Sequence, residues 1–162
     1  MRRLTTPLVV LSLFVIAGCQ YDPYAHRFTT SKPAFEDLTG IYRFNEQTAT
    51  NDPIGQAGID SYISLKADST YEVKNIPDVF NTDSATGKIN LTGYYSTHGK
   101  WEISSVGSVD YGSGLDKHWG LLLTGFDKEY ASIGLMGNKP PYEILVTLGD
   151  PDAGEVMIFS KE

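Results

Sequence analysis

Short stretches of alternating apolar and polar residues, separated by turn-forming residues, constrain the fold of this chain most. Between residues 70 and 75 tyrosine and valine alternate with charged residues, and a similar alternation recurs between residues 99 and 104. A period of two places one face of a strand in a core and the other in water. No window of about ten residues combines a period near 3.6 with good helix caps. The pattern predicts an all-β domain with few helices.

Roughly eight or nine strands are expected, at spacings of about 8–14 residues and joined mostly by short turns. The expected strands are Leu38–Phe44, Ile59–Leu65, Thr70–Asn75, Ile89–Tyr95, Gly99–Ser104, His118–Leu123, Ala131–Leu135, Tyr142–Leu148 and Glu155–Phe159. Residues 76–87 are interpreted as a longer polar excursion, and residues 107–114 as a flexible loop. Such a series predicts an antiparallel up-and-down meander of about eight strands, closed as a barrel; a β-sandwich is the alternative.

Three segments occur in a characteristic order: Leu38-Thr39-Gly40-Ile41-Tyr42, Leu65-Lys66-Ala67-Asp68-Ser69-Thr70-Tyr71 and Gly99-Lys100-Trp101-Glu102-Ile103. Together they resemble the bacterial lipocalin-like lipoproteins, in which a Gly-x-aromatic strand, a Leu-x-x-Asp-Gly-Thr-Tyr hairpin and a Gly-x-Trp strand follow one another. Ser69 replaces the usual glycine of the hairpin, and Tyr42 replaces the usual tryptophan of the first strand. The resemblance covers about the first half of the domain. It implies an eight-stranded lipocalin-like barrel and no particular ligand.

Large aromatic residues are the expected filling of this barrel. Tyr42, Tyr71 and Trp101 are predicted to line the core or a ligand cavity, with Phe44 as the alternative to Tyr42 in the first strand. Tyr62 and Leu121 are also expected to point inward. Strands of about seven residues, tilted by ~40°, give a height of ~18 Å and only three or four layers of side chains. A filled interior is therefore favoured, and a cavity for one small apolar ligand is the alternative.

The N-terminus has the features of a processing segment. Arg2 and Arg3 precede an apolar run from Leu8 to Ile16, and Ala17-Gly18 stands directly before Cys19, the single cysteine of the chain. The run of about nine residues is much shorter than the ~20 that a membrane-spanning helix needs. The pattern resembles the cleavage box of bacterial lipoproteins; an ordinary secretory signal is the alternative. The resemblance implies that cleavage exposes Cys19 and that acyl chains such as palmitate anchor it in a membrane.

The expected organisation is a signal peptide over residues 1–18, a lipidated cysteine with its tether over 19–36, and one barrel domain over 37–162. The mature chain would keep 144 of the 162 residues, which is the size of one domain. Its tether, residues 20–36, would reach ~56–60 Å if fully extended. The aromatic residues of this tether are expected either to dock on the domain or to lie among lipid headgroups: Tyr21, Tyr24, His26, Phe28 and Phe35.

The net charge and the expected location limit the classes of molecule that this protein could bind. Without Arg2 and Arg3 the chain has 11 basic and 20 acidic side chains, a formal charge of −9. This charge argues against nucleic acid and against electrostatic attachment to anionic lipid, so the acyl chains must hold the protein. Gln20 is not the aspartate that commonly retains lipoproteins at an inner membrane. We therefore expect the outer membrane, at its periplasmic face or at the cell surface.

No catalytic, cofactor or metal site is expected from the sequence. His26, His98 and His118 form no metal-ligand pair, and no Gly-x-Ser-x-Gly elbow occurs. The acidic segment Gly149–Glu155 lacks the spacing of a calcium loop and is interpreted as a hairpin turn. The leading hypothesis is a non-enzymatic envelope lipoprotein that contacts a protein or envelope component through residues 76–87 and 107–118. A lipocalin-type binder of a small apolar ligand is the alternative, and a hydrolase is the third class.

Overall fold

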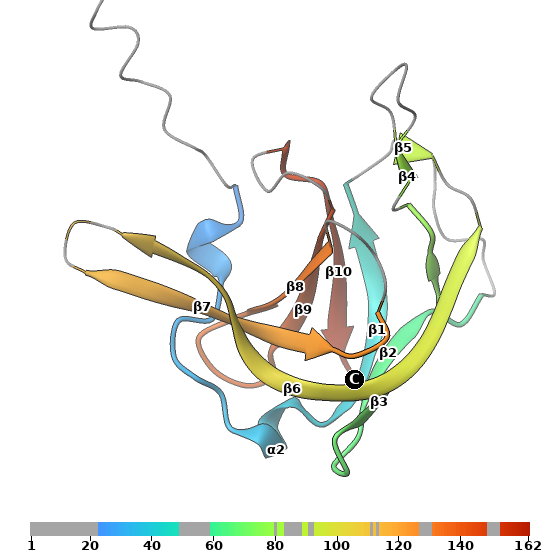
Figure 1. Ribbon diagram of the computed structural model, residues 1–162, viewed down its shortest axis with the longest axis horizontal. Coiled ribbons are helices and arrows are strands. Elements are labelled where there is room, and N and C mark those ends of the chain that lie inside the picture. The colour runs from blue at the N-terminus through green and yellow to red at the C-terminus, as the bar shows by residue number, and fades with distance from the viewer. Residues whose placement is uncertain are drawn as a thin grey trace, which may run out of the picture.

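Eight strands form one antiparallel sheet that closes on itself as a barrel (Figure 1). The computed structural model describes residues 23–48, 59–79, 81–82, 89–90, 93–110, 112, 114–126, 131–148 and 153–162. In order around the ring the strands are β1 (Gly40–Gln47), β2 (Tyr62–Leu65), β3 (Thr70–Pro77), β6 (Tyr94–Asp110), β7 (Leu115–Leu123), β8 (Ala131–Met136), β9 (Glu143–Leu148) and β10 (Val156–Lys161). β10 then pairs with β1. The predicted up-and-down meander is confirmed.

Helical structure in the described residues is limited to two short elements, η1 (Ala25–Arg27) and α2 (Phe35–Leu38). A small second sheet pairs β4 (Asn81–Thr82) with β5 (Ile89–Asn90). β4 lies in the segment interpreted from sequence as a polar excursion, whereas β5 lies at the start of the expected strand Ile89–Tyr95. The end of that expected strand and the expected strand Gly99–Ser104 belong to one continuous strand, β6, which corrects the prediction of two strands. The first expected strand begins two residues too early, because Leu38 belongs to α2.

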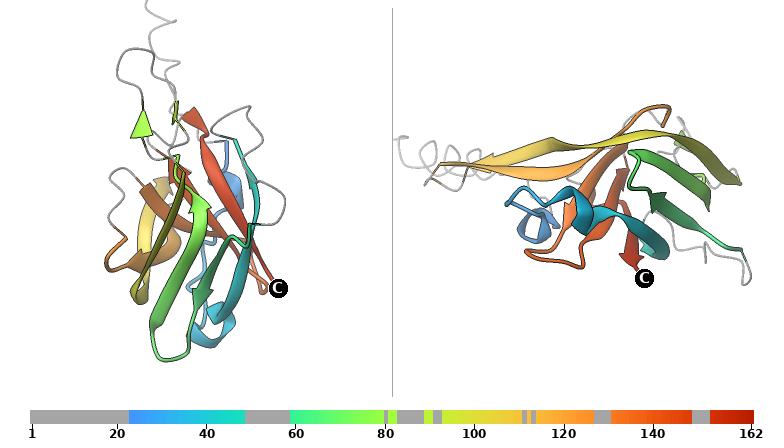
Figure 2. Two further views of the ribbon diagram at one scale, coloured as in Figure 1. Left: turned by 90° about the vertical axis from the view of Figure 1, so that its right-hand side faces the viewer. Right: turned by 90° about the horizontal axis from the view of Figure 1, so that it is seen from below.

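The predicted loop at residues 107–114 is wrong. β6 continues to Asp110 and β7 already begins at Leu115, so the two strands form a long hairpin. We call its outer part, residues 107–110 with 115–118, the arm; Figures 1 and 2 show it extending past the barrel. The register shifts between Ser105 and Gly107, so a β-bulge at Val106 interrupts the ladder and pairing resumes at Gly107 and His118.

The barrel interior is a single apolar cluster that includes Tyr42, Tyr71, Trp101 and Leu121. Tyr62 does not belong to it, which corrects the prediction. In β2 the buried positions are Ile63 and Leu65, so Tyr62 lies on the outer face, where the Lys74 ammonium is 5.6 Å from its ring centroid. Because side chains alternate along a strand, one residue of register decides which face a tyrosine occupies.

Residues 23–34, which we call the strap, lie against the barrel. The N–H of Thr29 donates to the Leu135 carbonyl in β8 (2.9 Å), and its carbonyl accepts from the Trp119 N–H in β7 (2.9 Å). β7 and β8 pair directly at Gly120 and Gly134. The strap therefore bridges the two strands where their direct pairing is shortest.

A second apolar cluster forms where the strap covers the outside of β8, β9 and β10. Its buried members are Phe28, Met136, Leu145, Val156 and Ile158, with Tyr24 packed against them. Docking of these two aromatic residues is thus confirmed, whereas His26 is exposed and Tyr21 lies outside the described residues. The upper limit of ~56–60 Å for a fully extended tether does not apply to residues 23–34, because they are docked on the barrel. The cleavage site and the domain boundary at residue 36 remain predictions.

Candidate interaction surface

The three aromatic residues singled out by sequence are core residues. Tyr42, Tyr71 and Trp101 are 0, 1 and 2 % exposed. Each donates a hydrogen bond to a backbone carbonyl: Tyr42 Oη to Leu38 (2.8 Å), Tyr71 Oη to Thr124 (3.1 Å) and Trp101 Nε1 to Lys66 (3.0 Å). Burial, aided by the negative charge of Asp37, raises the pKa of the Tyr42 hydroxyl well above its usual range. These bonds hold the rings in the core; contact with a ligand stays a prediction.

Large side chains occupy the space inside the ring. Phe159, Leu135, Ile144 and Met157 are completely inaccessible to solvent and join Tyr42 in the inner cluster. Three depressions formed by described residues, of about 150, 390 and 680 Å³, are open to solvent. The expectation of a filled interior therefore agrees with the packing of these side chains.

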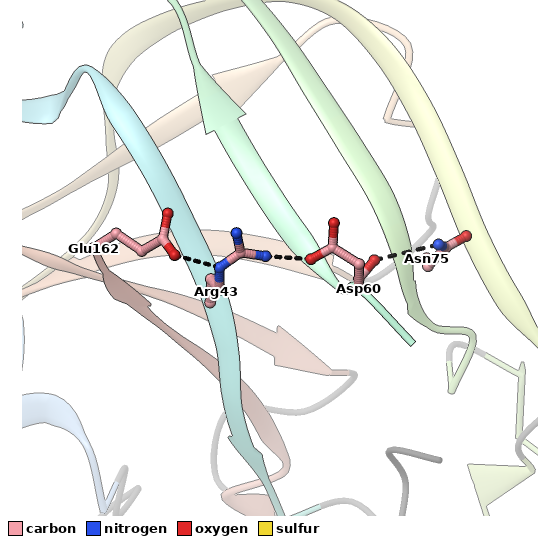
Figure 3. A network of polar contacts seen from close by, with 4 residues as sticks. All are labelled: Arg43, Asp60, Asn75 and Glu162. Atoms are coloured by element: carbon pink, nitrogen blue, oxygen red, sulfur yellow. Dashed lines mark hydrogen bonds and ion pairs between the residues drawn. The ribbon is translucent and has the colours of Figure 1, made fainter. Parts of the chain in front are cut away.

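The smallest depression, of about 150 Å³, lies beside a chain of polar contacts shown in Figure 3. Arg43 in β1 contacts Asp60 through Nη1 and Glu162 through Nε, the latter at 2.5 Å. The Glu162 hydrogen bond is the main cause that raises the pKa of the Arg43 guanidinium. Because two carboxylates already balance this cation, the depression offers no free positive charge to an anion. The network joins the chain end after β10 to β1 and β2.

The largest depression, of about 680 Å³, is a shallow groove across β3 and β6. Its polar lining includes Glu72, Lys74 and His98, and Glu72 lies opposite His98 in the strand register. Positive and negative groups are mixed, and the aromatic rings in the lining are those of His98 and the buried Tyr71. Nothing in this lining selects one class of ligand.

A third feature is the edge of β6 beyond the point where β3 ends. β3 pairs with β6 as far as Lys100, and the Trp101 N–H then donates to the Ser69 carbonyl (2.9 Å). Backbone groups alternate in direction along a strand, so those of Ile103 and Ser105 point to the same side as those of Trp101, away from β7. In the part of the chain that the structure describes, no strand pairs with this edge from Glu102 onward. We call residues 102–105 the free edge.

The depression of about 390 Å³ adjoins the free edge. It is lined by Lys32, Pro33, Phe35, Ser69, Trp101, Glu102 and Ile103. The Phe35 ring stacks on Trp101 with a centroid distance of 4.3 Å and an interplanar angle of 8°. Lys32 and Glu102 supply one charge of each sign to the rim. The depression therefore suits an apolar side chain of a segment that also carries polar groups.

Groups typical of metal or catalytic sites are dispersed. Within the described ranges no three His, Cys, Asp or Glu side chains gather closely enough to hold a metal ion. His118 is buried and its ring stacks on Phe28 at 4.6 Å, while His26 and His98 are exposed. Among the helices that the structure describes, none is long and apolar enough to cross a membrane. Cys19 and most of the acidic segment Gly149–Glu155 lie outside the described residues.

Sequence reasoning pointed to residues 107–118 but missed residues 102–105. The alternation of residues 99–104 correctly predicted a strand there. It could not show that β3 pairs with this strand only as far as Lys100 and leaves the following residues without a neighbouring strand on that side. Comparison with known proteins adds no relative from which a site could be transferred: no family model, curated protein or solved structure matches the chain.

Proposed function

We propose that this protein is a non-enzymatic, lipid-anchored lipoprotein of the outer membrane that binds an extended segment of a partner protein along the free edge of β6. The single observation behind the binding role is that the outward backbone groups of Ile103 and Ser105 have no strand partner in the described chain. Such an edge is a template for β-strand addition. Main-chain hydrogen bonds would give affinity, and the depression at Phe35 and Trp101 would select a side chain.

Charge favours a different protein over a second copy as the partner. The mature chain would carry a formal charge of −9, so two copies approaching edge to edge would repel each other. The partner segment is expected to be extended, with one large apolar side chain directed at the Phe35–Trp101 stack. The alternative of a small apolar ligand inside the barrel is less favoured. Such a ligand would have to displace side chains such as Phe159 that are completely buried.

The binding role can be tested by photo-crosslinking in native cells. A photoreactive residue replaces Glu102, next to the depression, or Glu46, an exposed acidic residue in β1. We expect a discrete adduct with another protein from position 102 and none from position 46. Adducts of equal yield at both positions, or an adduct consisting of two copies of this chain, would contradict the proposal.

A proline in the free edge provides the second arm of this experiment. Ser105→Pro removes an N–H that points away from β7 and leaves the β7 ladder intact, whereas Ser105→Ala keeps the N–H. We expect the proline variant to lose the adduct and the alanine variant to retain it, with equal thermal unfolding of the two. An adduct that survives the proline would show that the partner does not use this edge.

The anchor has its own test. Cys19→Ser should release the protein from membranes and abolish labelling with radioactive palmitate, because the acylated thiol is removed. Continued labelling, or unchanged membrane association, would refute the lipoprotein assignment. The binding experiment does not depend on this outcome, so the two parts of the proposal can fail separately.

A further inference from the structure

We infer that the barrel stands on the bilayer with the end that carries Pro23, Thr48 and Gly154 toward the lipid, so that the free edge of β6 faces away. This orientation rests on the proposed acylation of Cys19, but acylation alone does not supply it. An anchor on a long free tether would leave the domain able to tumble. The strap removes that freedom.

Pro23, at the start of the strap, is held at one end of the barrel. The Pro23 ring lies 2.9 Å from the position that a Cβ on Gly154 would occupy, in the turn that precedes β10. Thr48, which follows β1, donates its hydroxyl to the Gly154 carbonyl (2.8 Å) and accepts the Val156 N–H (2.9 Å). Residue 23 is therefore fixed beside the segment that leads into β10, and β10 begins at the upper end of the barrel in Figure 1.

Further contacts along the strap keep it in place. The Arg27 carbonyl accepts the Gly137 N–H (3.0 Å), and its guanidinium contacts Glu143 at 3.2 Å. The Thr29 hydroxyl donates to the Gly137 carbonyl (2.8 Å), in addition to the two backbone bonds of Thr29. Phe28 is only 8 % exposed. Lifting the strap would break all of these contacts together.

Few residues separate Cys19 from the docked strap. From Cys19 to Pro23 there are four residue steps, which span at most ~14 Å when fully extended. Strands of this length tilted in a barrel give a height of ~18 Å. The opposite end of the barrel therefore cannot reach the lipid while the strap stays docked.

The proposed binding edge belongs to the far end. Trp101 donates its N–H to Ser69 in the β2–β3 turn, which lies at the bottom of Figure 1 together with α2. The free edge starts at the next residue, Glu102. A partner segment would thus be bound on the side of the domain that the bilayer does not cover.

Two exposed alanines at opposite ends allow a direct test: Ala153 before β10 and Ala67 in the β2–β3 turn. Ala153→Cys and Ala67→Cys, each in the full acylated chain, are labelled with a thiol-reactive fluorophore. The proteins are then placed in phosphatidylethanolamine–phosphatidylglycerol vesicles that contain lipid spin-labelled at the headgroup. We expect several-fold stronger quenching at position 153 than at position 67. Equal quenching, or stronger quenching at position 67, would overturn the orientation.

A lengthened tether is the matched control. Ten Gly-Ser residues inserted between Asp22 and Pro23 leave the docked residues unchanged and add a coil with a root-mean-square length of ~18 Å. The quenching ratio should then fall toward one; an unchanged ratio would show that the short tether does not set the orientation. If Cys19 is not acylated, its thiol takes up a second fluorophore and the protein does not bind vesicles. That result would overturn the lipoprotein assignment as well, and is distinct from equal quenching of bound protein.

Discussion

Ser69 adopts a left-handed backbone conformation, with φ of 64°, in the β2–β3 turn. A residue with a Cβ is strained there by roughly 1–2 kcal/mol, which glycine avoids at some cost in unfolded-state entropy. Ser69→Gly should therefore raise the free energy of unfolding by about 1 kcal/mol, measured by urea denaturation. Ser69→Ala, which keeps the Cβ, should leave stability close to that of the original protein. A glycine variant no more stable than the alanine variant would contradict this account.

Asp68 closes the same turn by accepting hydrogen bonds from Thr70, from Oγ1 at 2.6 Å and from the backbone N–H at 3.0 Å. The hydroxyl bond is the larger cause, and together they lower the pKa of the Asp68 carboxyl. A carboxyl whose pKa is lower in the folded state adds stability above its unfolded pKa, and this is lost as the pH falls through the folded pKa. The stability gap between the original protein and Asp68→Asn should thus narrow from about pH 5 to about pH 2. The free energies of unfolding are measured by urea titration. If the difference between the two proteins stays constant across this pH range, the ionised carboxylate of Asp68 is not the source of the difference.

Individual core residues could be predicted where alternation was unambiguous. Tyr71 and Trp101 each alternate with charged neighbours, so their faces were evident from sequence. Tyr62 was misplaced because Tyr62 and Ile63 are both large and apolar, and only the pairing of Ile63 with Tyr42 and Val73 fixes the register of β2. The buried position of Phe28 had even less signal, since the other buried members of its cluster are more than one hundred residues away in the chain.

At the scale of elements, the strap packs against β8 at a glycine, Gly134, whose lack of a side chain leaves space for Phe28. A Cβ on Gly134 would lie 2.3 Å from Cε1 of Phe28. Gly134→Ala should therefore lower the free energy of unfolding by about 1–3 kcal/mol, the usual effect of overpacking. In a Phe28→Ala background, which itself costs about 3–5 kcal/mol, the added methyl has room and its further cost should fall close to zero. Denaturant unfolding of the original protein, the two single variants and the double variant gives the interaction free energy between residues 28 and 134.

Gly120→Ala is the matched control for this cycle. A Cβ at Gly120 would lie 2.2 Å from the Ile133 carbonyl oxygen, which is backbone and does not depend on Phe28. Its cost should be similar in both backgrounds. If Gly134→Ala behaves in the same way, with no relief from Phe28→Ala, the strap does not determine the requirement for glycine in β8.

The meander of about eight strands could be predicted because most strands carry their own short pattern, although β6 contains residues that were expected to form two strands. The arm and the strap could not, since both depend on accommodation between distant segments. Gly107 reads as a breaker, yet after a bulge at Val106 pairing resumes there with His118. The strap has no periodic pattern of its own; its hydrogen bonds go to whichever carbonyls and N–H groups β7 and β8 leave open. The free edge of β6, and with it the candidate binding site, could not be predicted either. It exists because β6 continues to Asp110 whereas its pairing with β3 stops at Lys100.

For the whole molecule, the two apolar clusters are opposite faces of the same strands. In β9 Ile144 belongs to the inner cluster and Leu145 to the outer one, and in β10 Met157 and Ile158 divide in the same way. If β9 or β10 unfolds, both clusters lose buried residues at the same time. The strap is therefore part of one cooperative unit with the barrel rather than an appendage that frays independently.

This unity predicts a single unfolding transition, and the two tryptophans of the chain report on it from different places. Trp101 lies inside the barrel, whereas Trp119 bonds to the strap through its backbone N–H and has the Lys32 ammonium 5.3 Å from its ring. In Trp101→Phe, fluorescence reports only on Trp119; in Trp119→Phe, only on Trp101. Within each variant the fluorescence and far-UV circular dichroism midpoints in urea should coincide, even though the first variant is less stable. If Trp119 fluorescence changed at lower urea than the circular dichroism of the same variant, the strap would be separating from the barrel before the barrel unfolds.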